Sequence, residues 1–342
     1  MAEPRRVYLH IGAPKTGTTY LQALLAHNRS ALAERGLLYP SLKGDAHHKP
    51  VWDLRGTPEQ RKDARGVSGS WQRLVEKVNA SELDALISSE HLVFAREPHV
   101  RQALAAFDAE LHVIYTARDL LRQVPAVWQE RIKNQQTVTY RDFVESIMGA
   151  GGPGARAFWT AQDAAGALLR WWVGDGARMH VVTAPPAGQP RHVLWDRFTS
   201  VLGVTGSEFD LQPQVKANAS LTLTQAELLR RYNDRHATDM AWVRYRTLLR
   251  AEVGGAFAAI GDPHKISLTH REREFFAARA AKINDQLVAK GCLVHGELGD
   301  LTPSVTSRDV GDPATLEPSD AELLDAALDL IHGLVSRRAD GP

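Results

Sequence analysis

A glycine- and threonine-rich segment near the N-terminus carries residues that can bind an anion. Residues 12–19 read GAPKTGTT and lie between an apolar stretch and a segment with helically spaced leucines. Backbone N–H groups in such a loop, and at the following helix N-terminus, bind phosphate or sulfate because the helix dipole favours negative charge there. Gly12 and Gly17 have the spacing of the ATPase phosphate loop, but that loop continues with lysine where this chain has Thr18. The lysine is instead Lys15, so we expect it to meet a bound anion from inside the loop.

Two further candidates follow other apolar segments. Glu90 comes after LDALISS, and Arg118 comes directly after LHVIYTA. A carboxylate can accept a proton from an attacking nucleophile within hydrogen-bond reach, and a guanidinium offers a planar fork of donors to a phosphate. His47 and His48, in GDAHHKPVW, are rival proton acceptors. His91 would point away from Glu90 if a strand continued through both residues.

The elements that must position these residues alternate between strands and helices. Strands are expected at residues 5–10, 83–89, 111–117 and 179–184, with helical segments between them. This alternation predicts a three-layer α/β fold with a central parallel sheet of about five strands. Such sheets bind ligands at the carboxyl ends of their strands, where all three candidate groups would lie.

The rest of the chain gives a coarse domain plan. Glycines and prolines crowd residues 40–70, which indicates a long surface excursion, and long helical segments follow from about residue 213. We expect a single domain over residues 1–303, with its core sheet at about 5–212 and a helical extension beyond. Residues 304–342 would form a linker, a terminal helix and a frayed tail.

Composition excludes several classes of protein. The chain has 342 residues and a formal net charge of +1, which argues against a nucleic-acid binder recognised by bulk charge. Hydrophobic residues make up 44% and charged residues 24%, which is typical of a folded globular chain. Cys292 is the only cysteine, and no signal peptide or transmembrane run is visible, so we expect a cytoplasmic protein. The histidines are dispersed, and no metal site is expected.

The string HIGAPKTGTTYLQ, residues 10–22, resembles the 5′-phosphosulfate-binding loop of sulfotransferases that use 3′-phosphoadenosine 5′-phosphosulfate (PAPS), and later stretches resemble bacterial members. The resemblance implies a P-loop-like fold and PAPS as co-substrate, released as 3′,5′-ADP without a metal. It implies that Lys15 lies near the oxygen that bridges phosphate and sulfate, and that Arg118 binds the 3′-phosphate. The residues it assigns to the 5′-phosphosulfate are Pro14, Lys15, Thr16, Gly17, Thr18 and Thr19.

One position departs from the family pattern. A serine usually stands eight residues after the arginine, but this chain has Ala126 there, and Gln123 or Ser220 could replace it. The base is a glutamate in the glycosaminoglycan branch and a histidine in the cytosolic branch. Glu90 is therefore the first choice, with His48 and His47 as alternatives.

These observations predict in-line sulfuryl transfer to a hydroxyl or amine of a small-molecule, carbohydrate or lipid acceptor. Trp52, Trp71 and Trp128 are candidates for stacking on that acceptor. Two alternatives stay open: a P-loop kinase or ATPase, and a nucleotide-binding module without catalysis. The sequence leaves the acceptor and the oligomeric state open.

Overall fold

The chain folds into two compact units. The computed structural model describes residues 4–42, 47–56, 66–149, 151–173, 177–212, 220–236, 239–249, 253, 256–257, 266–302 and 317–339. The first unit comprises Met1–Leu120, Ala157–Val215 and Ala278–Pro303, and the second comprises Leu121–Arg156, Lys216–Ala277 and Ser304–Pro342. The expected boundaries at residues 303 and 304 stay a prediction.

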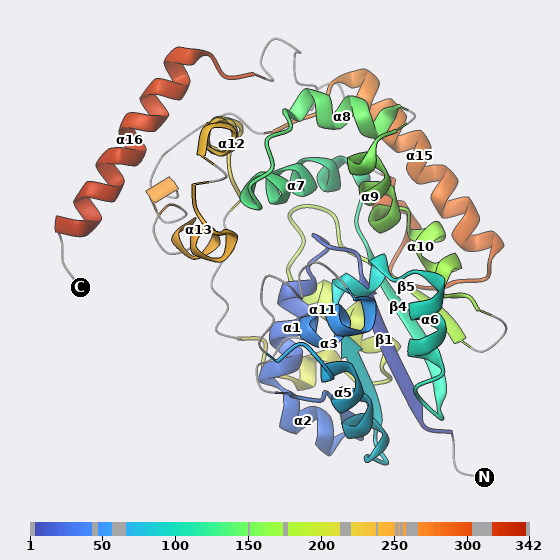
Figure 1. Cartoon of the computed structure of the whole chain (residues 1–342). Coiled ribbons are helices and arrows are strands. Elements are labelled where there is room, and N and C mark those ends of the chain that lie inside the picture. Colours follow the sequence, from blue (N-terminus) through green and yellow to red (C-terminus); the bar gives the residue numbers. More distant parts are fainter. Residues whose placement is uncertain are drawn as a thin grey trace. The chain divides into compact units, whose positions relative to one another are not determined.

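The first unit is built on one parallel sheet of six strands, in the order β2-β3-β1-β4-β5-β6 (Figure 1). The strands are β1 (Arg6–Gly12), β2 (Leu37–Leu38), β3 (Asp84–Ser88), β4 (Glu110–Ala117), β5 (Ala177–Thr183) and β6 (Leu293–His295). The α/β class and the central parallel sheet are thus confirmed. The sheet has one strand more than the five or so expected, and the sequence analysis identified neither β2 nor β6.

β1 lies in the interior of the sheet, and both of its faces are buried. Val7, Leu9 and Ile11 are fully buried, and so are Tyr8 and His10, which alternate with them. A strand buried on both faces is typical of a parallel sheet with helices on both sides. β1 pairs with β3 on one side and β4 on the other, so the loops after these three strands meet at one edge.

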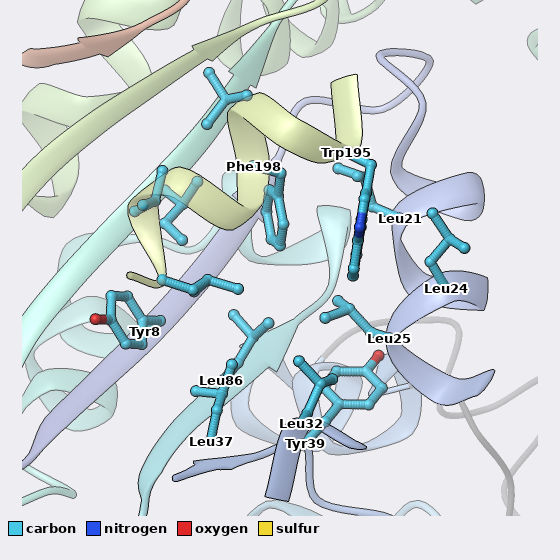
Figure 2. Packing of buried hydrophobic residues seen from close by; sticks show 14 of the residues in the cluster. Tyr8, Leu21, Leu24, Leu25, Leu32, Leu37, Tyr39, Leu86, Trp195 and Phe198 are labelled. Carbon is cyan, nitrogen blue, oxygen red and sulfur yellow. The ribbon is translucent and has the colours of Figure 1, made fainter. Parts of the chain in front are cut away.

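Helices complete the first unit. Some of these helices pack their leucines and aromatic rings against Tyr8, Leu86 and one face of the sheet, as Figure 2 shows. The helices are α1 (Thr18–His27), α2 (Arg29–Glu34), α3 (His48–Arg55), α5 (Ser70–Asn79), η1 (Glu90–Phe94), α6 (Glu97–Leu104), α10 (Ala164–Trp171), α11 (His192–Val201), η2 (Gly206–Glu208) and η4 (Leu298–Leu301), with parts of α9 (Pro153–Gln162) and α15 (His270–Ala289). The largest fully buried side chains that α11 contributes to this cluster are Trp195 and Phe198.

The described part of the second unit is helical. It contains most of α7 (Leu120–Lys133), then α8 (Tyr140–Met148), α12 (Leu223–His236), α13 (Trp242–Leu248) and α16 (Asp320–Ala339). Asn233 joins two of these helices, since its amide donates to Ile132 O at 2.8 Å and its carbonyl accepts from the hydroxyl of Tyr245 at 2.7 Å. The helical extension expected beyond residue 213 is therefore present, although β6 returns from it to the sheet.

One expectation about the fold is wrong. His48–Arg55, within the supposed surface excursion, form α3, which buries Pro50, Val51 and Leu54 and packs against α5 and η1. Proline is tolerated in the first turn of a helix, and Gly56 ends this helix in a left-handed conformation, so residues that looked like loop signals are helix-end signals. The described helix α16 runs to Ala339, and the frayed tail expected at the end of the chain stays a prediction. Among the described helices, none has the length and apolar character needed to cross a membrane.

Candidate functional site

The anion loop stands at the carboxyl end of the central strand, between β1 and α1. Gly17 has a φ of 100° and caps α1, a conformation that favours glycine. The loop is tied to the next strand, since the N–H of Ala13 donates to Thr116 O at 2.9 Å. The hydroxyl of Thr16 donates to Ala13 O at 2.7 Å and is buried. Thr16 can therefore offer a ligand its backbone N–H, whereas its hydroxyl is committed to holding the loop closed.

The other loop residues lie where an anion could reach them. Pro14 and Lys15 are half-buried, Thr18 is buried, and Thr19 is exposed on the first turn of α1. The first N–H groups of a helix have no partner within the helix, so the start of α1 supplies donors and the positive end of a dipole. The loop can therefore bind a phosphate or sulfate group, with the Lys15 ammonium as the nearest formal charge in the sequence.

Arg118 lies beside this loop. It follows β4, and its Nη1 donates to Lys15 O at 3.1 Å. Gln162, which the sequence analysis missed, also contacts the loop, since its Nε2 donates to Pro14 O at 3.4 Å. A partly open depression adjoins Arg118 and Gln162. It is lined by Tyr115, Ala117, Arg118, Leu120, Gln162, Ala164, Ala280, Ile283, Asn284 and Leu301.

Glu90 comes to the loop from β3, the strand that pairs with β1 on the side opposite to β4. The strand β3 ends at Ser88, and Ser89 caps the short helix η1, which begins with Glu90. The Nε2 of Gln22 in α1 donates to Glu90 Oε2 at 2.9 Å. Burial raises the pKa of Glu90, but the imidazoles of His48 and His91 and the Gln22 hydrogen bond outweigh it, and the net pKa is below its usual value. The carboxylate is thus ionised at neutral pH and able to accept a proton.

A chain of hydrogen bonds joins the loop to Glu90 across three strands. The Thr16 and Thr116 hydroxyls are 2.6 Å apart, and His10 Nε2 lies 3.3 Å from the Thr116 hydroxyl. His10 Nδ1 is 2.8 Å from the hydroxyl of Ser88, which accepts a 3.4 Å bond from Gln22 Nε2. Burial lowers the pKa of His10 to about 4, so this ring is neutral. The network fixes Gln22, and through it the carboxylate of Glu90, relative to the anion loop.

The two histidines of α3 differ in their surroundings. His47 is buried, with Nε2 donating to Pro40 O at 2.7 Å and Nδ1 accepting from the Ser88 N–H at 3.0 Å. Both of its ring nitrogens are therefore engaged with backbone. His48 is half-buried, and its Nδ1 lies 3.0 Å from the Ser89 hydroxyl. Of the two, His48 is the imidazole that a substrate could meet.

His91 lies beside Glu90 instead of pointing away from it. The expectation of opposite directions required the strand to continue, but the backbone turns into η1 after Ser89. The rings of His48 and His91 pack edge to face at 5.0 Å between centroids. Trp52 packs on His91 at 5.6 Å, which places one of the three candidate tryptophans at the site. Trp71 and Trp128 are buried, so neither can stack on an acceptor.

The residues proposed to replace the family's serine belong to the second unit. Gln123 lies in the first turn of α7 and is fully buried, and Ser220 is exposed ahead of α12. Ala126 lies on the same helix as Gln123, one residue after Pro125. The assignment of Gln123 and Ser220 to the 3′-phosphate stays a prediction.

Gly12 permits the close approach of the loop to Glu90, and its replacement by alanine is expected to destabilise the protein. Its φ is 112°, and a Cβ there would lie 3.2 Å from both Cα and Cβ of Glu90. Strain of this kind costs about 1–3 kcal/mol, measurable as a lower free energy of unfolding in urea. Gly36 is the matched control, since its φ is 81° but a Cβ there meets nothing within 4 Å. Equal losses for Gly12→Ala and Gly36→Ala would contradict the role of the Glu90 contact.

Buried neutral histidines are expected to make the fold sensitive to acid. Burial lowers the pKa of His47 to about 4, as it does for His10, against about 6.5 in the unfolded chain. Between these values the unfolded chain binds more protons, so the free energy of unfolding falls as pH decreases, by up to about 1.4 kcal/mol per pH unit for each histidine. Thermal unfolding from pH 7 to 4.5 should show a shallower decline for His47→Gln than for the parent. His236→Gln, at an exposed histidine, is the control for loss of an imidazole from the surface.

Comparisons with known proteins leave the family open. No protein-family model matches the chain, and no curated protein matches it. A solved structure described as the sulfotransferase domain from the curacin biosynthetic pathway is similar with a TM-score of 0.34 and 14% sequence identity. The match covers 82% of this chain and 99% of that domain. A likeness at this level carries no argument about activity, so the case for a function rests on the residues of the site.

Proposed function

We propose that the chain is a sulfotransferase that moves the sulfuryl group of PAPS to a hydroxyl or amine of an acceptor. One observation carries the proposal: the anion loop, Glu90 and Arg118 follow three adjacent parallel strands and meet at one edge of the sheet. Connections leave β1 and β4 toward opposite sides, which makes the crevice between their carboxyl ends the expected ligand site of an open α/β sheet.

The reaction needs one base and one group that stabilises the leaving oxygen. The acceptor oxygen or nitrogen attacks sulfur, a new bond to sulfur forms, and the bond from sulfur to the bridging oxygen breaks. Glu90 takes the acceptor's proton, and the electron pair remains on the bridging oxygen of 3′,5′-ADP. Lys15 faces the negative charge that grows on this oxygen, so its ammonium lowers the energy of the transition state more than that of the ground state.

The nucleotide would bind across the loop and Arg118. The loop N–H groups and the start of α1 suit the 5′-phosphate, and the guanidinium of Arg118 suits the 3′-phosphate through its fork of donors.

The alternatives have less support. A P-loop kinase would need a lysine at position 18, where this chain has threonine. A non-catalytic binding module could use the arginines of the C-terminal helices, but Arg230 and Arg231 of α12 both pair with Glu227, and Arg231 also pairs with Asp320. These ion pairs engage both guanidinium groups, and Arg230 and Glu227 are themselves half-buried.

Thermal unfolding with nucleotides tests the proposal. We expect 3′,5′-ADP at about 100 times its Kd to add about 2.7 kcal/mol, a shift of several degrees that does not need magnesium. A much smaller shift is expected with 5′-AMP, and Arg118→Ala should remove the difference between the two nucleotides. Arg101→Ala is the control, because Arg101 makes only an exposed ion pair with Glu97. Stabilisation by ATP with magnesium and none by 3′,5′-ADP would replace the proposal with the kinase alternative.

A further inference from the structure

Three side chains that can bind a metal gather at the carboxyl end of β3. His48 from α3 lies with Glu90 and His91 of η1, and one ligand atom from each lies within 4.8 Å of the other two. All three residues are half-buried. Two imidazoles and a carboxylate are a donor set typical of Zn²⁺, whereas Mg²⁺ and Ca²⁺ prefer oxygen ligands alone. His48 lies 41 residues before Ser89, and Ser89 directly precedes Glu90 and His91. No such cluster was therefore expected from the sequence.

Neighbouring groups hold two of these ligands in place. His48 Nδ1 lies 3.0 Å from the Ser89 hydroxyl, so it can donate there and leave the Nε2 lone pair for a metal. Gln22 donates to Glu90 Oε2 at 2.9 Å, which leaves Oε1 for the same ion. In metalloproteins, groups that hydrogen-bond to the metal ligands orient those ligands and raise the basicity of the ligands. The edge-to-face packing of the His48 and His91 rings further limits their rotation.

We propose that His48, Glu90 and His91 bind one Zn²⁺ ion, with solvent in the fourth position of a tetrahedron. Two ligand atoms at about 2.0–2.2 Å from a tetrahedral Zn²⁺ lie about 3.3–3.6 Å apart. The ligand atoms of the cluster lie within 4.8 Å of one another, so any two of them need to move together by at most about 1.5 Å. Side-chain rotations of the imidazoles and the carboxylate supply movements of this size.

Metal binding itself does not depend on the proposed sulfuryl transfer. The consequence of metal binding does depend on the proposed transfer, because an ion on the carboxylate of Glu90 would compete with the proton that the base must accept. Zn²⁺ would then hold the enzyme in an inactive state, and a chelator would release it. The anion loop and Arg118 contribute no ligand to the ion, so nucleotide binding should persist with or without the metal.

Cobalt titration tests the site directly. Untagged full-length protein, stripped with EDTA and dialysed, is titrated with Co²⁺ and followed by the visible d–d absorption of tetrahedral cobalt. We expect saturation at one equivalent and loss of the bands on addition of Zn²⁺. Removal of a group that hydrogen-bonds to a metal ligand weakens metal binding about 10–100-fold, so we expect Ser89→Ala to weaken cobalt binding by this factor. His48→Ala and His91→Ala, which remove ligands themselves, should each weaken cobalt binding by more than about 100-fold.

Two controls separate this site from other histidines. His236→Ala removes an exposed imidazole, and His295→Ala removes one that is 3.1 Å from His180 on the sheet, so both should leave the titration unchanged. Circular dichroism and thermal unfolding check that each variant is folded. Absence of the bands in the parent protein, or their persistence in His48→Ala, would overturn the proposal. Binding of 3′,5′-ADP, measured on the same metal-free protein, reports separately on the proposed function.

Discussion

Replacement of Lys15 by methionine is expected to slow the conversion of PAPS to 3′,5′-ADP by about 10²–10³-fold, with a much smaller loss of affinity for 3′,5′-ADP. An electrostatic group aimed at charge that develops in the transition state is worth this much in kcat. The ammonium of Lys15 has this role in the proposed reaction because the bridging oxygen becomes anionic only as sulfur departs. The ground state and the product need the loop N–H groups more than they need this charge.

Methionine keeps the length of the side chain and tests the charge alone. Lys15 has a φ of 68°, and methionine experiences the same backbone strain, so the loop should keep its conformation. The rate is measured as release of 3′,5′-ADP, with water as the acceptor until another is identified. Lys290→Met, at an exposed lysine of the first unit, is the matched control. Equal losses of rate and of 3′,5′-ADP affinity would show that Lys15 binds the nucleotide without acting in the transition state.

Much of this site could be predicted because its parts follow buried strands. β1, β3 and β4 are buried after their first residues. Each is followed closely by a group that can do chemistry, namely the loop, Glu90 and Arg118. Parallel strands bring their carboxyl ends to one edge, so three sequence-distant groups could be expected together before any geometry was known. The glycines of the loop were equally informative, since Gly12 and Gly17 both have positive φ.

The rest could not be predicted because its signals are short or ambiguous. β2 has two residues and β6 has three. Strands this short contain too few residues to show an alternating pattern of apolar and polar side chains. The helix α3 was hidden by Pro50 and Gly56, which mark helix ends as readily as loops. The contact between His48 and Glu90 depends on how α3 packs against η1, and that tertiary placement leaves no mark in local sequence.

Replacement of Glu90 by glutamine is expected to lower the rate of transfer by about 10²–10⁴-fold, the usual contribution of a general base, without changing the affinity for 3′,5′-ADP. The amide keeps the shape of the side chain and can still accept the hydrogen bond from Gln22. It cannot accept the acceptor's proton. Because the pKa of Glu90 is below its usual value, the rate of the parent enzyme should be level near neutral pH and fall only in acid, as the carboxylate becomes protonated.

Variants of the neighbouring imidazole decide which group is the base. His48→Gln should reduce the rate far less than Glu90→Gln, because His48 acts in the proposed reaction only by keeping the carboxylate ionised. Its loss should also move the acid limb of the pH profile upward, toward the ordinary pKa of a glutamate, since one of the charges that lowers that pKa is removed. Both profiles are measured in buffer with EDTA, so that no metal occupies the cluster. If His48→Gln abolished transfer while Glu90→Gln retained it, the imidazole would be the base, and Glu90 would be the group that orients it.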